Sequence, residues 1–252
     1  MKKVVSFSLW GTSEVYLRGA VDAIAQVHLH YPGWEPRFYL GADVPQVTRQ
    51  ELIERGAAIF DGPAWGPWAG MFWRFLAAID PDVGIMISRD VDTQILPREV
   101  EAVNEWLASG KTLHIMRDHP RHEMPVMGGM WGCRTIRLRD MEAMILKWNK
   151  FSKYGCDQAF LGRVVYPRFR DDSWIHSECV YFSKELIHSF PSARQDDGYV
   201  GAAIREQDLV TKYNRYMNEW IELGKPVYLR PHPWSFPGRL RLLKLIIMRQ
   251  LK

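Results

Sequence analysis

Two aspartates, Asp90 and Asp92, carry the strongest chemical signal in the chain. They directly follow the apolar run 83–87, which is typical of a buried parallel strand. Alternate positions of an extended segment point the same way, so both carboxylates could offer oxygens to one hard cation. Such a cation would neutralise a diphosphate and help it to leave. The alternative is a solvated turn or helix cap, because Asp-x-Asp pairs are common.

A second titratable cluster, residues 117–122, follows the apolar run 112–116. It contains Asp118 and His119 and is too charged for a core. Either side chain could act as a general base on an acceptor hydroxyl, or bind a sugar. A salt-bridged loop is an equal alternative.

The elements that must position these groups alternate between strand and helix in the first half of the chain. Strands are expected at 3–9, 36–40, 57–60, 83–88 and 112–116, and helices at 13–30, 47–55, 70–79 and 97–107. The second half is less regular, with helices expected at 138–150, 156–165 and 208–223 and a strand at 174–182. This order predicts an α/β fold: a mostly parallel sheet with helices on both faces and ligands beyond the carboxyl ends of its strands.

The composition excludes several classes of protein. With 47% hydrophobic and 25% charged residues, the 252-residue chain is neither disordered nor collagen-like. No apolar run reaches the roughly 18 to 20 residues that span a bilayer, and we expect no signal peptide. Three cysteines are too few for a disulfide framework. The net charge of +4 does not suggest a nucleic-acid binder. We therefore expect a cytoplasmic protein without a nucleic-acid partner.

An ordered set of motifs over residues 3–201 resembles a family of glycosyltransferase-like proteins. Members of this family occur in bacteria and large DNA viruses and have the type A nucleotide-diphospho-sugar transferase fold. The motifs are Ser6-Phe7-Ser8-Leu9-Trp10-Gly11, Gly70-Met71-Phe72-Trp73-Arg74-Phe75-Leu76, Ser88-Arg89-Asp90-Val91-Asp92, Gly128-Gly129-Met130-Trp131-Gly132, Asp157-Gln158-Ala159-Phe160-Leu161 and Tyr199-Val200-Gly201. We expect residues 1–207 to form this domain and residues 208–252 a helical extension.

The resemblance implies a metal-dependent transfer of a sugar from a nucleotide-diphosphate donor, most simply a UDP-sugar, to a glycan or lipid-linked acceptor. Polysaccharide assembly is the expected setting. Asp92 would bind Mn²⁺ or Mg²⁺ directly, while Asp90 would share the metal or hold the ribose. One alternative is a catalytically silent module that binds nucleotides or sugars. A metal-dependent phosphohydrolase of the haloacid-dehalogenase type ranks lower, because Thr93 is one position out of its Asp-x-Asp-x-Thr pattern.

The resemblance also suggests donor-binding residues. The end of the first strand cradles the base and ribose in this fold, so Ser8 is expected there and Trp10 could stack on the base. Arg74 lies 16 residues before Asp90, and glycogenin-like glycosyltransferases carry a basic residue near the donor at a like spacing. Arg74 could bind the diphosphate or ribose, and Arg89 could do similar work or only bridge to its neighbours.

The remaining assignments concern the sugar and the metal. Gly128 and Gly129 would let the backbone approach a ligand, with Trp131 as a sugar platform; a glycine bulge is the alternative. Asp157 and Gln158 match a pair that touches the donor sugar in glycogenin-like enzymes, although an acid there also suits a helix N-terminus.

His176 is expected as a third metal ligand, with His232 as its rival. Related sequences read His-Asp-Ser where this chain has His176-Ser177-Glu178. The tail 238–252 alternates basic and apolar residues and predicts a basic amphipathic helix. This helix would either contact the inner face of a membrane or dock on the body of the protein.

Overall fold

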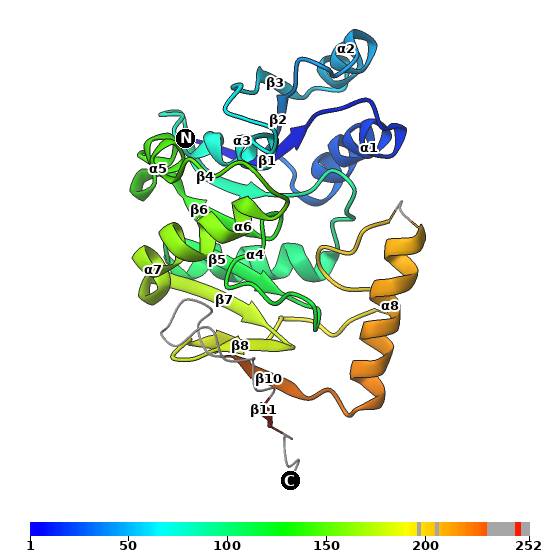
Figure 1. The fold of residues 1–252 in the computed structure, drawn as a ribbon, viewed down its shortest axis with the longest axis vertical. Helices are drawn as coiled ribbons and strands as arrows, with labels where there is room; N and C mark the ends of the chain where they lie inside the picture. The colour runs from blue at the N-terminus through cyan, green and yellow to red at the C-terminus, as the bar shows by residue number, and fades with distance from the viewer. Residues whose placement is uncertain (196–197, 205–206, 231–244, 248–252) are drawn as a thin grey trace.

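A mixed eight-stranded sheet organises the chain in the computed structural model, which describes residues 1–195, 198–204, 207–230 and 245–247 (Figure 1). The strand order is β3-β2-β1-β4-β6-β5-β7-β9. All neighbours are parallel except β6, which is antiparallel to both β4 and β5. The strands are β1 (Lys2–Leu9), β2 (Glu35–Leu40), β3 (Ala58–Asp61), β4 (Val83–Ser88), β5 (Leu113–Arg117), β6 (Trp131–Arg134), β7 (Ser173–Ser177) and β9 (Ile187–His188).

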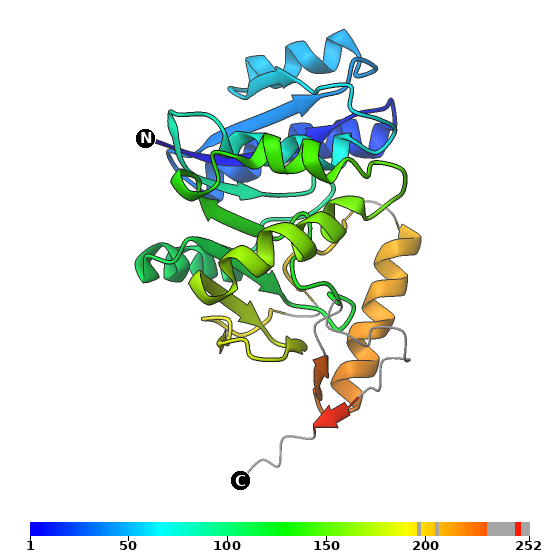
Figure 2. The ribbon, with the colours of Figure 1, turned by 60° about the vertical axis from the view of Figure 1, so that its left-hand side comes forward.

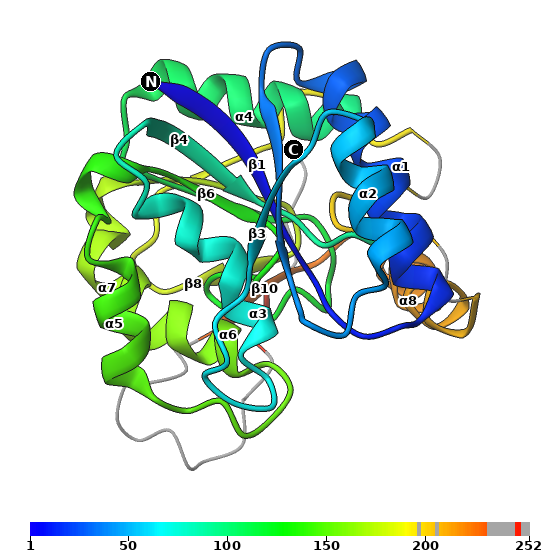
Figure 3. The same cartoon turned by 90° about the horizontal axis from the view of Figure 1, so that it is seen from above.

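Helices cover both faces of this sheet, as the alternating pattern predicts (Figure 3). On one face α1 (Glu14–His30), α2 (Gln46–Glu54) and α4 (Pro97–Ser109) pack over one apolar cluster. On the other, α3 (Gly70–Trp73), α5 (Met141–Trp148), α6 (Cys156–Phe160) and α7 (Tyr166–Phe169) pack over a second. The central strands are buried on both sides, which explains their continuous apolar runs.

Two expected helices are not uniform. The segment predicted as one helix over 70–79 is α3 followed by the 3₁₀ helix η1 (Arg74–Ala78). The segment predicted over 156–165 is α6 followed by the π-helical turn η3 (Leu161–Val165). Short 3₁₀ helices η2 (Thr135–Arg137) and η4 (Arg170–Asp172) follow β6 and α7. Arg74 at the start of η1 and Asp157 in α6 belong to the site described below.

The second half departs further from the sequence expectation. The single strand expected at 174–182 is two strands, because β7 ends at Ser177 and β8 (Val180–Phe182) joins another sheet of order β11-β10-β8. Its partners are β10 (Val227–Arg230) and β11 (Leu245–Ile247). The prediction of a helix in the tail is wrong at residues 245–247, which form β11. The rest of 238–252, and His232, lie outside the described residues.

Helix α8 (Gln207–Glu222) confirms the helix expected at 208–223. It stands beside the carboxyl ends of the central strands in both side views (Figure 2). His119 belongs to the loop after β5, and its Nε2 lies 3.0 Å from the carbonyl oxygen of Tyr213 on α8. Across the described part of the chain, no helix is both long and apolar enough to cross a membrane.

Candidate functional site

An arginine held between two aspartates forms the centre of the site. Arg74 begins η1; its Nη1 donates to Asp90 Oδ1, and its Nη2 donates to Asp157 Oδ2 at 3.1 Å. Asp90 follows β4, and Asp157 is the second residue of α6. Three segments that are distant in sequence therefore meet where the parallel strand β4 ends, which is the edge at which α/β sheets bind ligands.

The backbone of two glycines, Gly128 and Gly129, lies directly behind these carboxylates. Because β6 is antiparallel, it starts where β4 ends: Ser88 pairs with Trp131, and Ser88 Oγ donates to the Gly128 carbonyl at 2.8 Å. A Cβ on Gly129 would lie 1.9 Å from Asp90 Oδ2. A Cβ on Gly128 would lie 2.2 Å from Asp157 Oδ2. Any side chain here would displace the carboxylates, so the glycines are required by this arrangement.

Asp157 is the buried member of the cluster. Its side chain is fully buried, and no described residue donates a hydrogen bond to its Oδ1. Burial raises the pKa of the Asp157 carboxyl; Arg74 and the nearby Gln158 backbone N–H oppose this, and the Asp90 carboxylate adds to it. Burial alone would lower the pKa of Arg74, but the two carboxylates raise it above its ordinary value. The cluster thus holds a permanent cation and one carboxylate oxygen without a hydrogen-bond donor.

The end of β1 borders the same cluster. Ser8 Oγ accepts a hydrogen bond from the Arg74 backbone N–H at 2.9 Å and so fixes the start of η1. Trp10 follows β1 and is 37% exposed, with its ring centroid 6.2 Å from that of Trp73 in an edge-to-face contact. A Cβ on Gly70 would lie 2.6 Å from the Trp10 ring, so the backbone supports that ring closely.

Asp92 lies in the same turn after β4 as Asp90, here called the acidic turn, and is half-buried like Asp90. Its carbonyl accepts a hydrogen bond from the Ile204 backbone N–H at 3.0 Å, and Thr93 forms an antiparallel bridge with Ala203. The segment that precedes α8 therefore crosses the acidic turn. From the other side α1 approaches so closely that a Cβ on Gly19 would lie 2.4 Å from the Val91 carbonyl oxygen.

Several solved structures are similar to this chain. A 4-diphosphocytidyl-2C-methyl-D-erythritol synthase from Anaerococcus prevotii is similar over 86% of this chain and 98% of its own, with 12% identity and a TM-score of 0.50. A glycosyltransferase involved in the glycosylation of the major capsid of PBCV-1 covers 87% and 100%, with 12% identity and a TM-score of 0.47. The galactosyltransferase LgtC, in complex with donor and acceptor sugar analogues, covers 87% and 99%, with 15% identity and a TM-score of 0.46.

The chain has the type A nucleotide-diphospho-sugar transferase fold. At these identities the likeness concerns the fold alone. No protein-family model matches the sequence, and the search of curated proteins finds no match.

Several residues predicted for the site do not join the cluster in this type A fold. Asp118 is fully buried and paired with Arg98 at 3.1 Å and Arg194 at 2.6 Å, and it accepts the Val200 backbone N–H at 3.0 Å. His119 is also buried: its Nδ1 accepts the Arg121 N–H at 3.0 Å, and its Nε2 faces the Tyr213 carbonyl. Burial lowers the pKa of His119 to about 4. Both side chains tie the loop after β5 to the second half of the chain.

Arg89 and His176 point into the protein as well. Arg89 is 2% exposed and pairs with Glu99 on α4, on the opposite face of the sheet from Arg74. His176 on β7 has both ring nitrogens engaged, with Nδ1 3.0 Å from His114 Nε2 and Nε2 3.0 Å from Glu105 Oε2. With both nitrogens engaged, we leave His176 out of the metal site proposed below.

The burial of Trp131 and Gln158 bears on two further predictions. Trp131 is fully buried and packs edge-to-face on Phe75 at 5.2 Å, so the idea of a sugar platform at Trp131 is wrong. Gln158 follows Asp157 in α6 and is half-buried.

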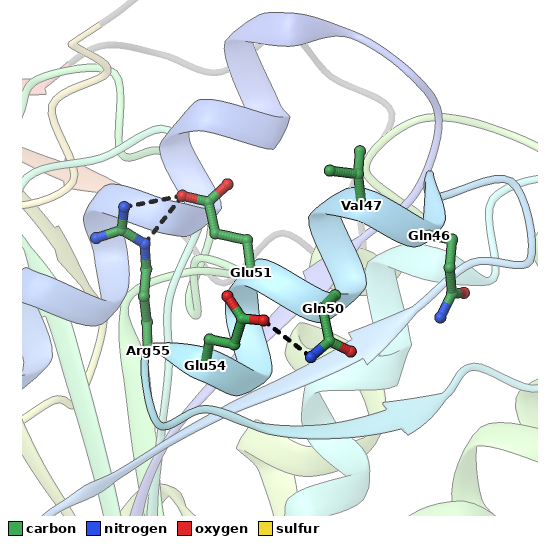
Figure 4. A pocket seen from close by; sticks show the side chains of 6 residues that line it. All are labelled: Gln46, Val47, Gln50, Glu51, Glu54 and Arg55. Atoms are coloured by element: carbon green, nitrogen blue, oxygen red, sulfur yellow. Dashed lines mark hydrogen bonds and ion pairs between the residues drawn. The ribbon is translucent and has the colours of Figure 1, made fainter.

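The sequence reasoning missed Tyr154. This residue lies two positions before α6 and is 74% exposed, and its ring centroid is 5.9 Å from that of Trp68 in an edge-to-face contact. The signal that could have found it was an exposed aromatic residue just before Gly155 and Asp157. A recess elsewhere on the surface is a weaker candidate for a functional site (Figure 4). Its lining residues all come from α2 or its C-terminal end, and four of them pair with one another: Gln50 with Glu54, and Arg55 with Glu51.

Proposed function

We propose that the protein is a metal-dependent glycosyltransferase that moves a sugar from a nucleotide-diphosphate donor, UDP most simply, to a glycan or lipid-linked acceptor. The observation that carries this proposal is the cluster of Arg74, Asp90 and Asp157 on the Gly128–Gly129 backbone at the end of β4. It combines anionic oxygens for a cation with a guanidinium for a phosphate, at the ligand-binding edge of a nucleotide-sugar fold.

The donor atoms fit Mn²⁺ or Mg²⁺. The Asp90 side chain is 43% exposed, and the buried Asp157 keeps one oxygen without a hydrogen-bond donor. Asp92, two residues after Asp90, adds a third carboxylate to the same region. Carboxylate oxygens are the ligands that these hard cations prefer. No three His, Cys, Asp or Glu side chains of the described residues already form a metal-binding group, so the diphosphate and water would complete the shell.

A bound cation would stabilise the charge that develops on the leaving diphosphate. The work of the chain itself is to bind and orient that diphosphate. Arg74 donates to two carboxylates here, and phosphate oxygens are equally good acceptors for its guanidinium. We propose that Arg74 turns from Asp90 towards the diphosphate when donor and metal bind, which frees the Asp90 oxygens for the cation.

Neighbouring residues would complete the donor site. Trp10 would stack on the base, while Ser8 keeps η1 and Arg74 in place through its hydrogen bond to the Arg74 N–H. Asp157 and Gln158, at the start of α6, would touch the donor sugar. We do not give Asp118 or His119 a part in proton transfer, because buried ion pairs and hydrogen bonds occupy them.

A catalytically silent binding module is the second candidate. The ion pairs of Arg74 favour it, because Asp90 and Asp157 are already neutralised without a metal. Such a module would bind a nucleotide sugar and leave it intact. Transfer of the sugar to a defined acceptor would exclude this alternative.

A binding screen tests the proposal directly. Calorimetric titration with UDP, GDP, CDP and their sugars, each with and without Mn²⁺, should find at least one nucleotide whose binding requires the metal. A chain that binds no nucleotide diphosphate under either condition would refute both the transferase and the silent module.

A further inference from the structure

Two loops beside the proposed donor site form a continuous wall of aromatic side chains. One loop joins β3 to α3 and carries Trp65 and Trp68; the other joins α5 to α6 and carries Phe151 and Tyr154. The Trp68 backbone N–H donates to the Phe151 carbonyl at 3.1 Å. Trp65 stacks on Phe151 with centroids 6.1 Å apart, and Trp68 meets Tyr154 edge-to-face at 5.9 Å. We call Trp65, Trp68 and Tyr154 the aromatic wall.

Phe151 fixes the aromatic wall to the protein core, against which Trp65 and Trp68 also pack. Phe151 is buried and contacts Phe72 of α3 edge-to-face at 5.2 Å. Its loop leaves α5 and enters α6 through left-handed backbone at both ends, with φ of 45° at Asn149 and 75° at Gly155. A loop anchored in this way presents its exposed rings in a set position, which lowers the entropic cost of binding a ligand.

The aromatic wall is open to solvent mainly at Tyr154. Trp65 and Trp68 are half-buried, while Tyr154 is 74% exposed, so the Tyr154 ring adds little to the core. Apolar rings with a polar end are the side chains that binding sites use most often. This exposure therefore points to a ligand that covers the wall.

The wall borders the reaction centre. Only two residues separate Tyr154 from Asp157, so their Cα atoms lie at most about 11 Å apart. Partial burial, and then the carboxylates of Asp90, Asp157 and Asp92, raise the pKa of the Tyr154 hydroxyl, in agreement with this short chain separation. A molecule on the wall would therefore lie beside the groups proposed to hold the donor.

We propose that the aromatic wall is the acceptor site and that it binds the apolar face of a neutral saccharide ring. This inference rests on the proposed transferase function. A pyranose presents C–H groups on one face, which pack on aromatic rings, and its hydroxyls extend outwards, where one can reach the donor. The nucleobase is assigned to Trp10, which is attached to β1 and packs on Trp73 and Gly70 rather than on the wall.

Glycan binding by variants of the wall tests the inference without relying on turnover. A printed panel of neutral hexopyranosides and disaccharides is probed with the wild-type chain, with Tyr154→Ala and with Trp68→Ala. Tyr154→Ala is expected to bind the recognised glycan about five- to tenfold more weakly through the loss of one stacked ring, and Trp68→Ala by a similar factor because Tyr154 loses the edge-to-face neighbour that holds its ring. Tyr154→Phe should stay within about twofold, because the ring and not the hydroxyl makes the contact.

Phe60→Ala is the matched control, since Phe60 is also an exposed aromatic residue but lies on β3 at the edge of the sheet. It should bind the glycan like the wild type. If the wild type binds no neutral glycan, or if Tyr154→Ala and Trp68→Ala bind as well as Phe60→Ala, the inference is overturned.

Metal-dependent UDP affinity, measured on the same preparations, separates this inference from the proposed function. Intact UDP binding without wall-dependent glycan binding refutes the acceptor site alone. A UDP affinity that falls in Tyr154→Ala while glycan binding is unchanged assigns the wall to the donor and also overturns the inference. If the wild type binds no UDP, the proposed transferase function is refuted, whatever the glycan-binding measurements show.

Discussion

Arg74→Met would remove the cation that lies between Asp90 and Asp157 while keeping a side chain of similar length. The two carboxylates would then face each other without a counterion. A divalent cation competes with Arg74 for the same oxygens, so the variant should bind Mn²⁺ more tightly in the absence of nucleotide. It should also bind UDP more weakly at saturating Mn²⁺, because the guanidinium no longer reaches the diphosphate.

The size of both effects follows from burial. Two unit charges about 4 Å apart interact by about 4 kcal/mol at an effective dielectric constant of about 20. Asp90 is 43% exposed, which reduces its pair with Arg74 to about 1 kcal/mol, whereas the buried pair with Asp157 keeps more. We expect Mn²⁺ affinity to rise about 10- to 100-fold, or about 1.4 to 2.8 kcal/mol. Loss of a charged hydrogen bond should weaken UDP binding by about tenfold or more.

Electron paramagnetic resonance of free Mn²⁺ measures the first effect, and calorimetry measures the second. Arg74→Met leaves Asp157 buried without a cation, which costs about 3 kcal/mol of folding free energy. The double variant Arg74→Met/Asp157→Asn therefore serves as a stability control, and Arg74→Lys keeps the charge. Unchanged or weaker Mn²⁺ binding by folded Arg74→Met would show that Arg74 does not compete with the metal.

Three other predictions follow from single contacts. Trp10→Ala should weaken UDP binding about fivefold by calorimetry, with little change in melting temperature, because the ring is partly exposed; equal affinity would remove it from the base site. Gly129→Ala places a Cβ 1.9 Å from Asp90 Oδ2 and should abolish Mn²⁺-dependent UDP binding, whereas the control Gly84→Ala should not. Full binding by Gly129→Ala would contradict the close approach of the Gly129 backbone to Asp90. His119 has a folded pKa of about 4, below its ordinary 6.5, so the unfolded chain takes up the proton first as the pH falls. Its contribution to stability is present above pH 6.5 and should fall by about 2 kcal/mol at pH 5. Urea unfolding at pH 7 and 5 measures this; His119→Gln should reduce the decrease by about that amount and leave the part that comes from the other buried histidines, such as His114 and His122, whose pKa values burial also lowers.

Much of the fold was predictable because apolar periodicity is a local property. The first five strands and the helices between them lie within one or two residues of the expected bounds, and Pro97 begins α4 as predicted. The strand β6 was missed because it has only four residues and contains a glycine. The break between β7 and β8 was missed because no glycine or proline marks it at Glu178 and Cys179, and only the pairing of the two strands with different sheets separates them.

The candidate site could be predicted from the sequence where a residue follows a strand. It was less predictable where the ion-pair or hydrogen-bond partner of a side chain decides where that side chain lies. Asp90 lies at the end of β4, as the strand-end rule suggests, and Arg74, Asp157 and the glycine pair, which the family resemblance singles out, meet it there. The charged cluster after β5 obeys the same rule, yet Asp118 pairs with arginines from α4 and from residue 194, which no local pattern reveals. Sequence spacing alone also cannot show that Tyr154 is exposed beside Trp68.

The most direct test of the central claim is the Mn²⁺ dependence of UDP binding in the double variant Asp90→Ala/Asp92→Ala. Glu51→Ala/Glu54→Ala, which removes two acidic side chains from α2, is the control for lost charge. We predict that the wild type and the control bind UDP about tenfold more tightly, or about 1.4 kcal/mol, with Mn²⁺ than without it, and that the folded double variant gains nothing from the metal. The same Mn²⁺-dependent gain in the double variant would contradict the claim that these aspartates couple the metal to the donor.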